Sequence, residues 1–164
     1  MMTASNAIPW DATDPDVLVV ACSDGRFQGE LDLYLRSERQ IEHYDRLYLP
    51  GGAGALVPSG IEFTRAAALQ KECRFLIEAH GITHVLLLFH GPAADGPDEA
   101  ACGDYRREFP GYSASQIRKQ QDEDLAELLR FPIWRGVKLE ALRIEVTRSC
   151  TVEFVKLYES SAIE

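Results

Sequence analysis

Basic residues, cysteines and long apolar runs are all scarce in this chain of 164 residues. Lys and Arg together number 17 against 26 Asp and Glu, so the formal net charge is −9. This excess of negative charge opposes non-specific attraction to nucleic acid and to anionic membrane surfaces. No apolar run approaches the ~18 residues that a membrane-spanning helix requires, and no N-terminal segment joins a basic region to an apolar one. We therefore expect a cytoplasmic protein that binds neither nucleic acid nor membrane.

The four cysteines, at positions 22, 73, 102 and 150, are too sparse for a disulfide scaffold. They remain available as metal ligands, nucleophiles or core residues. Cys73 and Cys150 lie inside a helical and a strand pattern, so we expect both to be packing residues. Hydrophobic residues make up 46% of the chain, enough for one substantial core. We expect a polar, proline-containing arm or loose end over residues 1–15 and a single domain over residues 16–164.

Short apolar runs alternate with helical periodicity along the chain. Val17 to Ala21 and His84 to Phe89 are continuous apolar runs, which are typical of strands buried on both faces of a parallel sheet. Helical spacing follows the first run, up to about Ile41, and recurs over residues 61–79. Leu47 to Leu49 offer another strand between these helices. Strands that alternate with helices in this way predict an α/β fold.

Capping and turn signals complete the predicted order of elements. Ser59 with Glu62, and Ser113 with Gln116, have the spacing of a capping box at a helix N-terminus. Alternating apolar residues then stand on either side of Arg148-Ser149-Cys150, which predicts a strand pair or one long bent strand. The whole pattern predicts a mostly parallel central sheet flanked by helices, with an antiparallel edge strand.

Three chemically active side chains stand where the first predicted strand meets the first helix. Cys22, Asp24 and Arg26 occupy every second residue there. Ligands of open α/β sheets bind at the carboxyl ends of the strands. His90 follows the later apolar run in the same way, and Cys102 comes after a loop punctuated by Gly and Pro. If the two strands are neighbours, Cys22 and His90 lie at one rim, with Cys102 able to fold back over it.

Two thiolates and one imidazole are a ligand set that suits Zn²⁺, and three protein ligands leave the fourth tetrahedral position open. Zinc in such a site lowers the pKa of bound water to about 7. Asp24 can accept a hydrogen bond from that water, while the guanidinium fork of Arg26 keeps the carboxylate off the metal. The pattern therefore favours a catalytic zinc site.

The stretch Cys22-Ser23-Asp24-Gly25-Arg26 resembles the Cys-x-Asp-x-Arg hallmark of the β-class carbonic anhydrases. His90, and Cys102 followed by glycine, are similar to the later His and Cys of that family, and the turn from Pro50 to Gly54 resembles its glycine-bearing turn. The resemblance covers roughly residues 17 to 147.

This resemblance implies a β-carbonic-anhydrase-like fold in which Cys22, His90 and Cys102 hold Zn²⁺. It implies reversible hydration of carbon dioxide to bicarbonate by zinc-bound hydroxide, with Asp24 and Arg26 as the catalytic residues. It also implies a homodimer or higher homo-oligomer.

Two alternatives remain open on the sequence alone. The family spaces its ligands His-x-x-Cys, whereas eleven residues separate His90 from Cys102. A carboxylate from Asp95, Asp98 or Asp104 is therefore an alternative third ligand, because carboxylates also bind zinc. The function has alternatives as well: a related zinc hydrolase acting on carbonyl sulfide or carbon disulfide, or a non-catalytic binding or regulatory protein.

Overall fold

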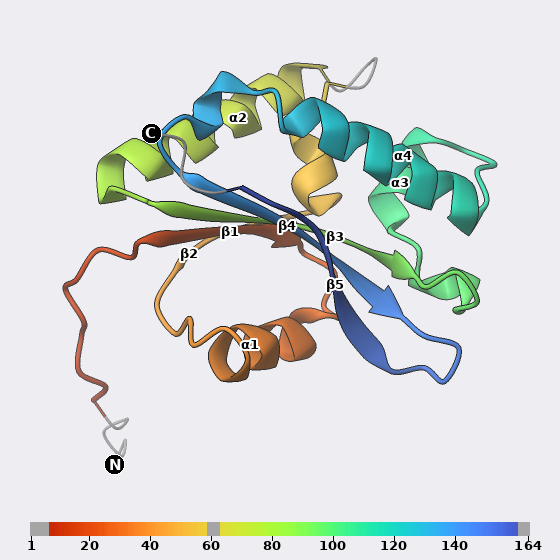
Figure 1. The fold of residues 1–164 in the computed structure, drawn as a ribbon, viewed down its shortest axis with the longest axis horizontal. Coiled ribbons are helices and arrows are strands. Elements are labelled where there is room, and N and C mark those ends of the chain that lie inside the picture. Colours follow the sequence, from red (N-terminus) through yellow and green to blue (C-terminus); the bar gives the residue numbers. More distant parts are fainter. Residues whose placement is uncertain (1–6, 59–62, 161–164) are drawn as a thin grey trace, which may run out of the picture.

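The computed structural model describes residues 7–58 and 63–160, which form a five-stranded sheet with helices on both faces (Figure 1). Within these residues no helix is both long and apolar enough to cross a membrane. Ser59 and Glu62, the first predicted capping box, lie outside the described residues. The elements, in chain order, are β1 (Val17–Cys22), α1 (Gln28–Ser37), β2 (Asp45–Leu49), η1 (Gly52–Leu56), α2 (Phe63–His80), β3 (His84–Pro92), η3 (Asp98–Ala100), α3 (Gly103–Glu108), α4 (Ala114–Leu128), η4 (Pro132–Trp134), β4 (Lys138–Val146) and β5 (Val152–Glu159).

The strands are ordered β2-β1-β3-β4-β5 across the sheet. The pairs β1–β2, β1–β3 and β3–β4 are parallel, and only β4 and β5 pair antiparallel. The predicted fold class is therefore confirmed. The two alternating segments at the end of the chain are a hairpin, which makes β5 the antiparallel edge strand.

Alternate residues of β1 enter two separate cores, because successive side chains of a strand point to opposite faces. Leu18 and Val20 join the core under α2 and α4, whereas Val17 and Val19 join the core that packs on α1. Figure 1 shows α1 on one side of the sheet and α2, α3 and α4 on the other. Burial on both faces explains why the sequence of β1 is apolar throughout instead of alternating.

The chain leaves β1 in one direction across the sheet and later returns to its other side. It passes through α1 to reach β2, and through α2 to reach β3, and these two helices cover opposite faces. The carboxyl ends of β1 and β3 thus flank a point at which the strand order reverses. In open α/β sheets such a point leaves a crevice where ligands bind.

Two sequence expectations are corrected by the structure. The strand predicted to end at Phe89 continues to Pro92, because Gly91 and Pro92 pair with Glu145 and Val146 of β4. The expectation that Cys150 packs in the core is wrong: its side chain is exposed and its backbone is left-handed, with φ 59°. It belongs to the tight turn between β4 and β5, where the N–H of Cys150 donates to the carbonyl of Thr147. Cys73 is buried in α2, as expected.

Candidate metal centre

Cys22 is the last residue of β1, so its sulfur stands at the carboxyl edge of the sheet. The chain beyond it is held close to β2, because the N–H of Ser23 donates to the carbonyl of Leu49 at 3.1 Å. The side-chain amide of Gln28, in the first turn of α1, donates to the carbonyl of Cys22 at 2.9 Å. These two bonds fix the backbone on both sides of the thiol.

The glycine-bearing turn after β2 is what lets the chain pass close to Cys22. Gly52 has a φ of 55°, which L side chains rarely adopt. A Cβ at this position would lie 2.7 Å from the carbonyl oxygen of Leu88 and 2.8 Å from the backbone nitrogen of Cys22. Only glycine fits between the ends of β1 and β3 here, so the turn packs directly under the candidate site.

His90 comes from β3, the neighbour of β1, and is only 2% exposed. Its Nδ1 lies 3.2 Å from the carbonyl oxygen of Ala100, and a carbonyl oxygen can only accept a hydrogen bond. Nδ1 is therefore a donor nitrogen, so in the neutral ring Nε2 is the nitrogen that can bind a metal. Among the described residues, buried Nε2 has no hydrogen-bond partner. The ring of Phe27 packs on the imidazole with its centroid 4.5 Å away.

Cys102 is the residue immediately before α3 and is 1% exposed. The chain between His90 and Cys102 leaves β3, forms the short turn η3 and comes back to the sheet edge (Figure 1). The expanded spacing therefore does not separate the two side chains in space.

The structure brings the side chains of Cys22, His90 and Cys102 together. One ligand atom of each, a sulfur or an imidazole nitrogen, lies within 4.8 Å of the other two. None of the alternative carboxylates belongs to this group. Asp104, the nearest of them in sequence to Cys102, is instead paired with Arg65 and Arg107.

The two thiols interact strongly with each other. The pKa of Cys22 falls from 9.0 to about 4, first because the Cys102 thiol donates a hydrogen bond to its sulfur. Burial opposes this shift, and the nearby His90 imidazole acts in its favour. Donating that hydrogen bond, together with burial, raises the pKa of Cys102. The pair thus holds one proton between two sulfurs, a proton that metal binding would release.

Asp24 is held beside this group without belonging to it. Its Oδ1 accepts hydrogen bonds from the backbone N–H and the Nε of Arg26, both at 3.0 Å, and its Oδ2 accepts from Nη2 at 2.6 Å. These hydrogen bonds from the Arg26 side chain are the main reason why the pKa of Asp24 is lowered. The carboxylate is therefore ionised and turned toward the guanidinium.

The donor set fits a zinc ion. Two neighbouring sulfurs and one imidazole nitrogen are ligands that zinc prefers. The buried, unpartnered Nε2 of His90 is the atom a metal would satisfy, and the bond from Nδ1 to a carbonyl is the usual way in which a ligand histidine is oriented. Three side chains of the chain could therefore hold a metal ion here, while the carboxylate of Asp24 is engaged by Arg26.

Several residues of this region escaped the sequence analysis. Gln28 contacts Cys22, and Phe27 contacts His90. The carbonyl oxygen of Glu99 accepts a hydrogen bond from Arg26, and that of Ala100 accepts one from His90. Only Phe27, an apolar residue beside the Cys-x-Asp-x-Arg stretch, carries a sequence signal. Backbone carbonyls carry none, since every residue has one.

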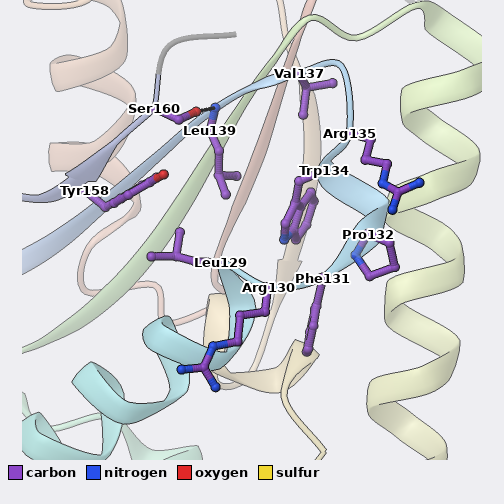
Figure 2. A pocket seen from close by; sticks show the side chains of 10 residues that line it. All are labelled: Leu129, Arg130, Phe131, Pro132, Trp134, Arg135, Val137, Leu139, Tyr158 and Ser160. Carbon is purple, nitrogen blue, oxygen red and sulfur yellow. Dashed lines mark hydrogen bonds between the residues drawn. The ribbon is translucent and has the colours of Figure 1, made fainter. Parts of the chain in front are cut away.

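A pocket elsewhere in the molecule lacks comparable chemistry. It lies at the start of β4 and the end of β5 and has a volume of about 220 Å³. Phe131 and Trp134 are among the residues that line it (Figure 2). Arg130 and Arg135 line it but extend in different directions (Figure 2). Because β3 and β4 are parallel, this pocket lies at the opposite edge of the sheet from Cys22 and His90.

No family model and no curated protein match this sequence. The chain does resemble solved structures of carbonic anhydrases. The one from Glaciozyma antarctica is 14% identical with a TM-score of 0.47, and 88% of this chain and 82% of that chain are covered. The one from Streptococcus mutans is 14% identical with a TM-score of 0.48, with 93% and 87% covered.

A β-carbonic anhydrase, isoform I (TvaCA1) from Trichomonas vaginalis, is 11% identical with a TM-score of 0.48, and 92% of this chain and 88% of that chain are covered. The predicted resemblance to the β-class carbonic anhydrases is confirmed as a likeness to these solved structures.

Proposed function

We propose that this chain is a zinc-dependent, carbonic-anhydrase-like enzyme that catalyses the reversible hydration of carbon dioxide to bicarbonate. The observation that carries the proposal is the meeting of Cys22, His90 and Cys102 within 4.8 Å, with Nε2 of His90 buried and unpartnered. This meeting joins residues from β1 and β3 with the residue that precedes α3.

Zinc held by three protein ligands leaves one position for water and lowers the pKa of that water to about 7, which supplies a nucleophile at neutral pH. Cys22 and Cys102 would contribute thiolate ligands, and His90 would contribute Nε2. The carbonyl of Ala100 keeps His90 in the tautomer that leaves Nε2 free to bind.

Asp24 and Arg26 act together in this proposal. Arg26 engages both carboxylate oxygens of Asp24, so the carboxylate stays ionised and does not take the place of water. An ionised carboxylate beside the centre can accept a hydrogen bond from the attacking water or hydroxide and orient it toward carbon dioxide. We propose Asp24 as the residue that orients the nucleophile by accepting its hydrogen bond, and Arg26 as the residue that holds Asp24 in place.

The proposal extends to the organisation of the protein. We propose one catalytic domain over residues 16–164, in a cytoplasmic homodimer or higher homo-oligomer. The described part of the preceding arm, residues 7–15, contains no helix or strand and leads away from the sheet (Figure 1). The side chains of Ile8 and Trp10 in this arm are exposed, so neither packs in the core of the domain.

The direct test is zinc content and carbon dioxide hydration of three proteins. Wild type purified without added metal is expected to hold about one zinc per chain and to hydrate carbon dioxide in a stopped-flow assay with a pH indicator. Cys102→Ser is expected to lose most of its zinc and its activity, since the ligand set loses a thiolate. Cys150→Ser is the matched control, because that thiol is exposed in the β4–β5 turn and is not among the three grouped side chains.

Each other result has a definite meaning. Folded wild type without zinc would overturn the proposal. Zinc-loaded wild type that hydrates no carbon dioxide would leave a metal-binding protein and overturn the enzymatic part. Full zinc content in Cys102→Ser would remove Cys102 from the ligand set.

A further inference from the structure

The turn η3 lies within the expanded segment between His90 and Cys102. Its three successive carbonyl oxygens accept hydrogen bonds from side chains in and around the candidate centre. The carbonyl of Ala100 accepts from Nδ1 of His90 at 3.2 Å. The carbonyl of Glu99 accepts from Nη1 of Arg26 at 2.7 Å, and that of Asp98 accepts from Nη2 of Arg106 at 2.6 Å. One short turn thereby touches a metal-ligand candidate, the residue that holds Asp24, and a residue that the proposed function does not use.

The segment that carries η3 is a packed structure. The N–H of Ala93 donates to the carbonyl of Val146 at 2.9 Å, and the N–H of Gly96 donates to the carbonyl of Ala93 at 3.0 Å. A Cβ added at Gly96 would collide with the carbonyl oxygen of Val146. The segment is thus fitted against the end of β4 on one side of η3.

Arg106 closes the other side. It lies on α3, one turn beyond Cys102, and its N–H donates to the carbonyl of Cys102 at 3.1 Å. Its guanidinium reaches back to η3, so it ties the turn to the helix that begins at the candidate ligand. The residue is exposed, and its side-chain hydrogen bond goes to the carbonyl of Asp98 in η3 and not to one of the three grouped side chains.

We propose that Arg106 is a positioning residue of the metal centre, acting through η3. By holding the carbonyl of Asp98, it fixes the next two carbonyls, which orient Arg26 and His90. The inserted segment, which lengthens the family's ligand spacing, then serves as the outer support of the site. This inference rests on the proposed function, because it assumes that the centre binds zinc.

The test measures the geometry and affinity of the metal site in Arg106→Ala, Arg106→Lys and Arg148→Ala. Zinc affinity is measured by competition with a chromogenic chelator, and ligand geometry by the visible spectrum of the cobalt-substituted protein. Arg106→Ala is expected to bind zinc about tenfold more weakly, the lower end of the range for residues that orient metal ligands, and to show an altered cobalt spectrum. Arg106→Lys is expected to recover most of both, because an ammonium can donate to the same carbonyl. Arg148→Ala removes an exposed arginine from the β4–β5 turn and should match wild type.

A second variant reaches η3 from its other anchor. Gly96→Ala is expected to displace the segment and alter the cobalt spectrum in the same direction as Arg106→Ala. Gly29→Ala is its control, because a Cβ there meets nothing within 4 Å. Wild-type affinity and an unchanged cobalt spectrum in both Arg106→Ala and Gly96→Ala would overturn the positioning role and leave the proposed function intact. A wild type that binds no zinc would instead remove the proposed function, and this inference with it.

Discussion

Replacing Asp24 by Asn tests whether this carboxylate has a catalytic role or only a structural one. The substitution keeps the size of the side chain but removes the negative charge that Arg26 holds through both oxygens. The Arg26 side chain is 55% exposed, so water screens the pair from the arginine side, whereas the Asp24 side chain is 19% exposed. Exposed ion pairs contribute about 0–1 kcal/mol to stability. For a chain of this length, about 1 kcal/mol corresponds to a change in Tm of about 2–4 °C.

The expected effect on catalysis is much larger than this effect on stability. Loss of the carboxylate that accepts a hydrogen bond from the nucleophile should slow carbon dioxide hydration at least about tenfold, the lower limit for residues that orient a metal site or its water. Zinc content should stay near that of wild type, because Asp24 is not among the three grouped ligands. Stopped-flow hydration, elemental analysis and thermal unfolding of the same preparation give all three quantities.

The matched control for this experiment is Glu78→Gln. Glu78 pairs with Arg74 on α2, and both side chains are more than half exposed, so the change also removes one carboxylate from an arginine pair. It should leave hydration unchanged. Wild-type hydration in Asp24→Asn would refute the role of this carboxylate. A loss of hydration that only follows a loss of zinc would refute the separation of Asp24 from the ligand set.

Two further predictions concern the scaffold. Gly52→Ala should destabilise the fold by at least about 1–2 kcal/mol in urea unfolding, from the left-handed backbone alone. It should also lower zinc content, because its Cβ would collide with the backbones of Cys22 and Leu88. Unchanged stability and zinc content would contradict this close approach. Arg39→Ala should destabilise the fold by up to about 3 kcal/mol, the lower end for breaking a buried ion pair, because Glu140 loses its bidentate partner but keeps contacts with His84 and Lys156. Burial raises the pKa of Glu140, but the hydrogen bonds from Arg39 bring it below its usual value, so this pair stabilises the fold above the unfolded pKa and is lost as the pH falls through the folded pKa. When the pH is lowered beyond about 4, the urea midpoint of wild type should decrease more steeply than that of Arg39→Ala. Equal dependence of the two midpoints on pH would contradict this assignment.

The fold was largely predictable because its strongest local signals agree with its topology. The continuous apolar runs of β1 and β3 reflect burial on both faces, and the Ser113 and Gln116 side chains form the predicted capping box. The end of β3 was harder to predict, since Gly91 and Pro92 are turn residues by composition. They are strand residues here because β4 continues beside them. That pairing is a tertiary effect without a local signal.

The candidate site divides in the same way. The residues Cys22, Asp24 and Arg26 carry chemistry in a short pattern, so the sequence alone points to them. The contacts of η3 could not be predicted, because they join side chains to backbone oxygens, and Arg26 reaches Glu99 across 73 positions of sequence. The exposure of Cys150 was missed for a related reason: alternating strand patterns flank it on both sides, and only the hairpin geometry shows that it sits in the turn.

The dispersal of the grouped side chains along the chain bears on how the protein is made. Cys22 leaves the ribosome with the first strand, whereas His90 and Cys102 follow only after β2, α2 and most of β3 have been synthesised. An emerging chain therefore presents one of the grouped side chains long before the other two can meet it. Closing such distant contacts requires the central strands to be paired first, which is a slow step in parallel sheets. Under the proposed function, metal binding would therefore follow pairing of the central strands, and Cys22 would stay without its partner ligands until β3 is in place.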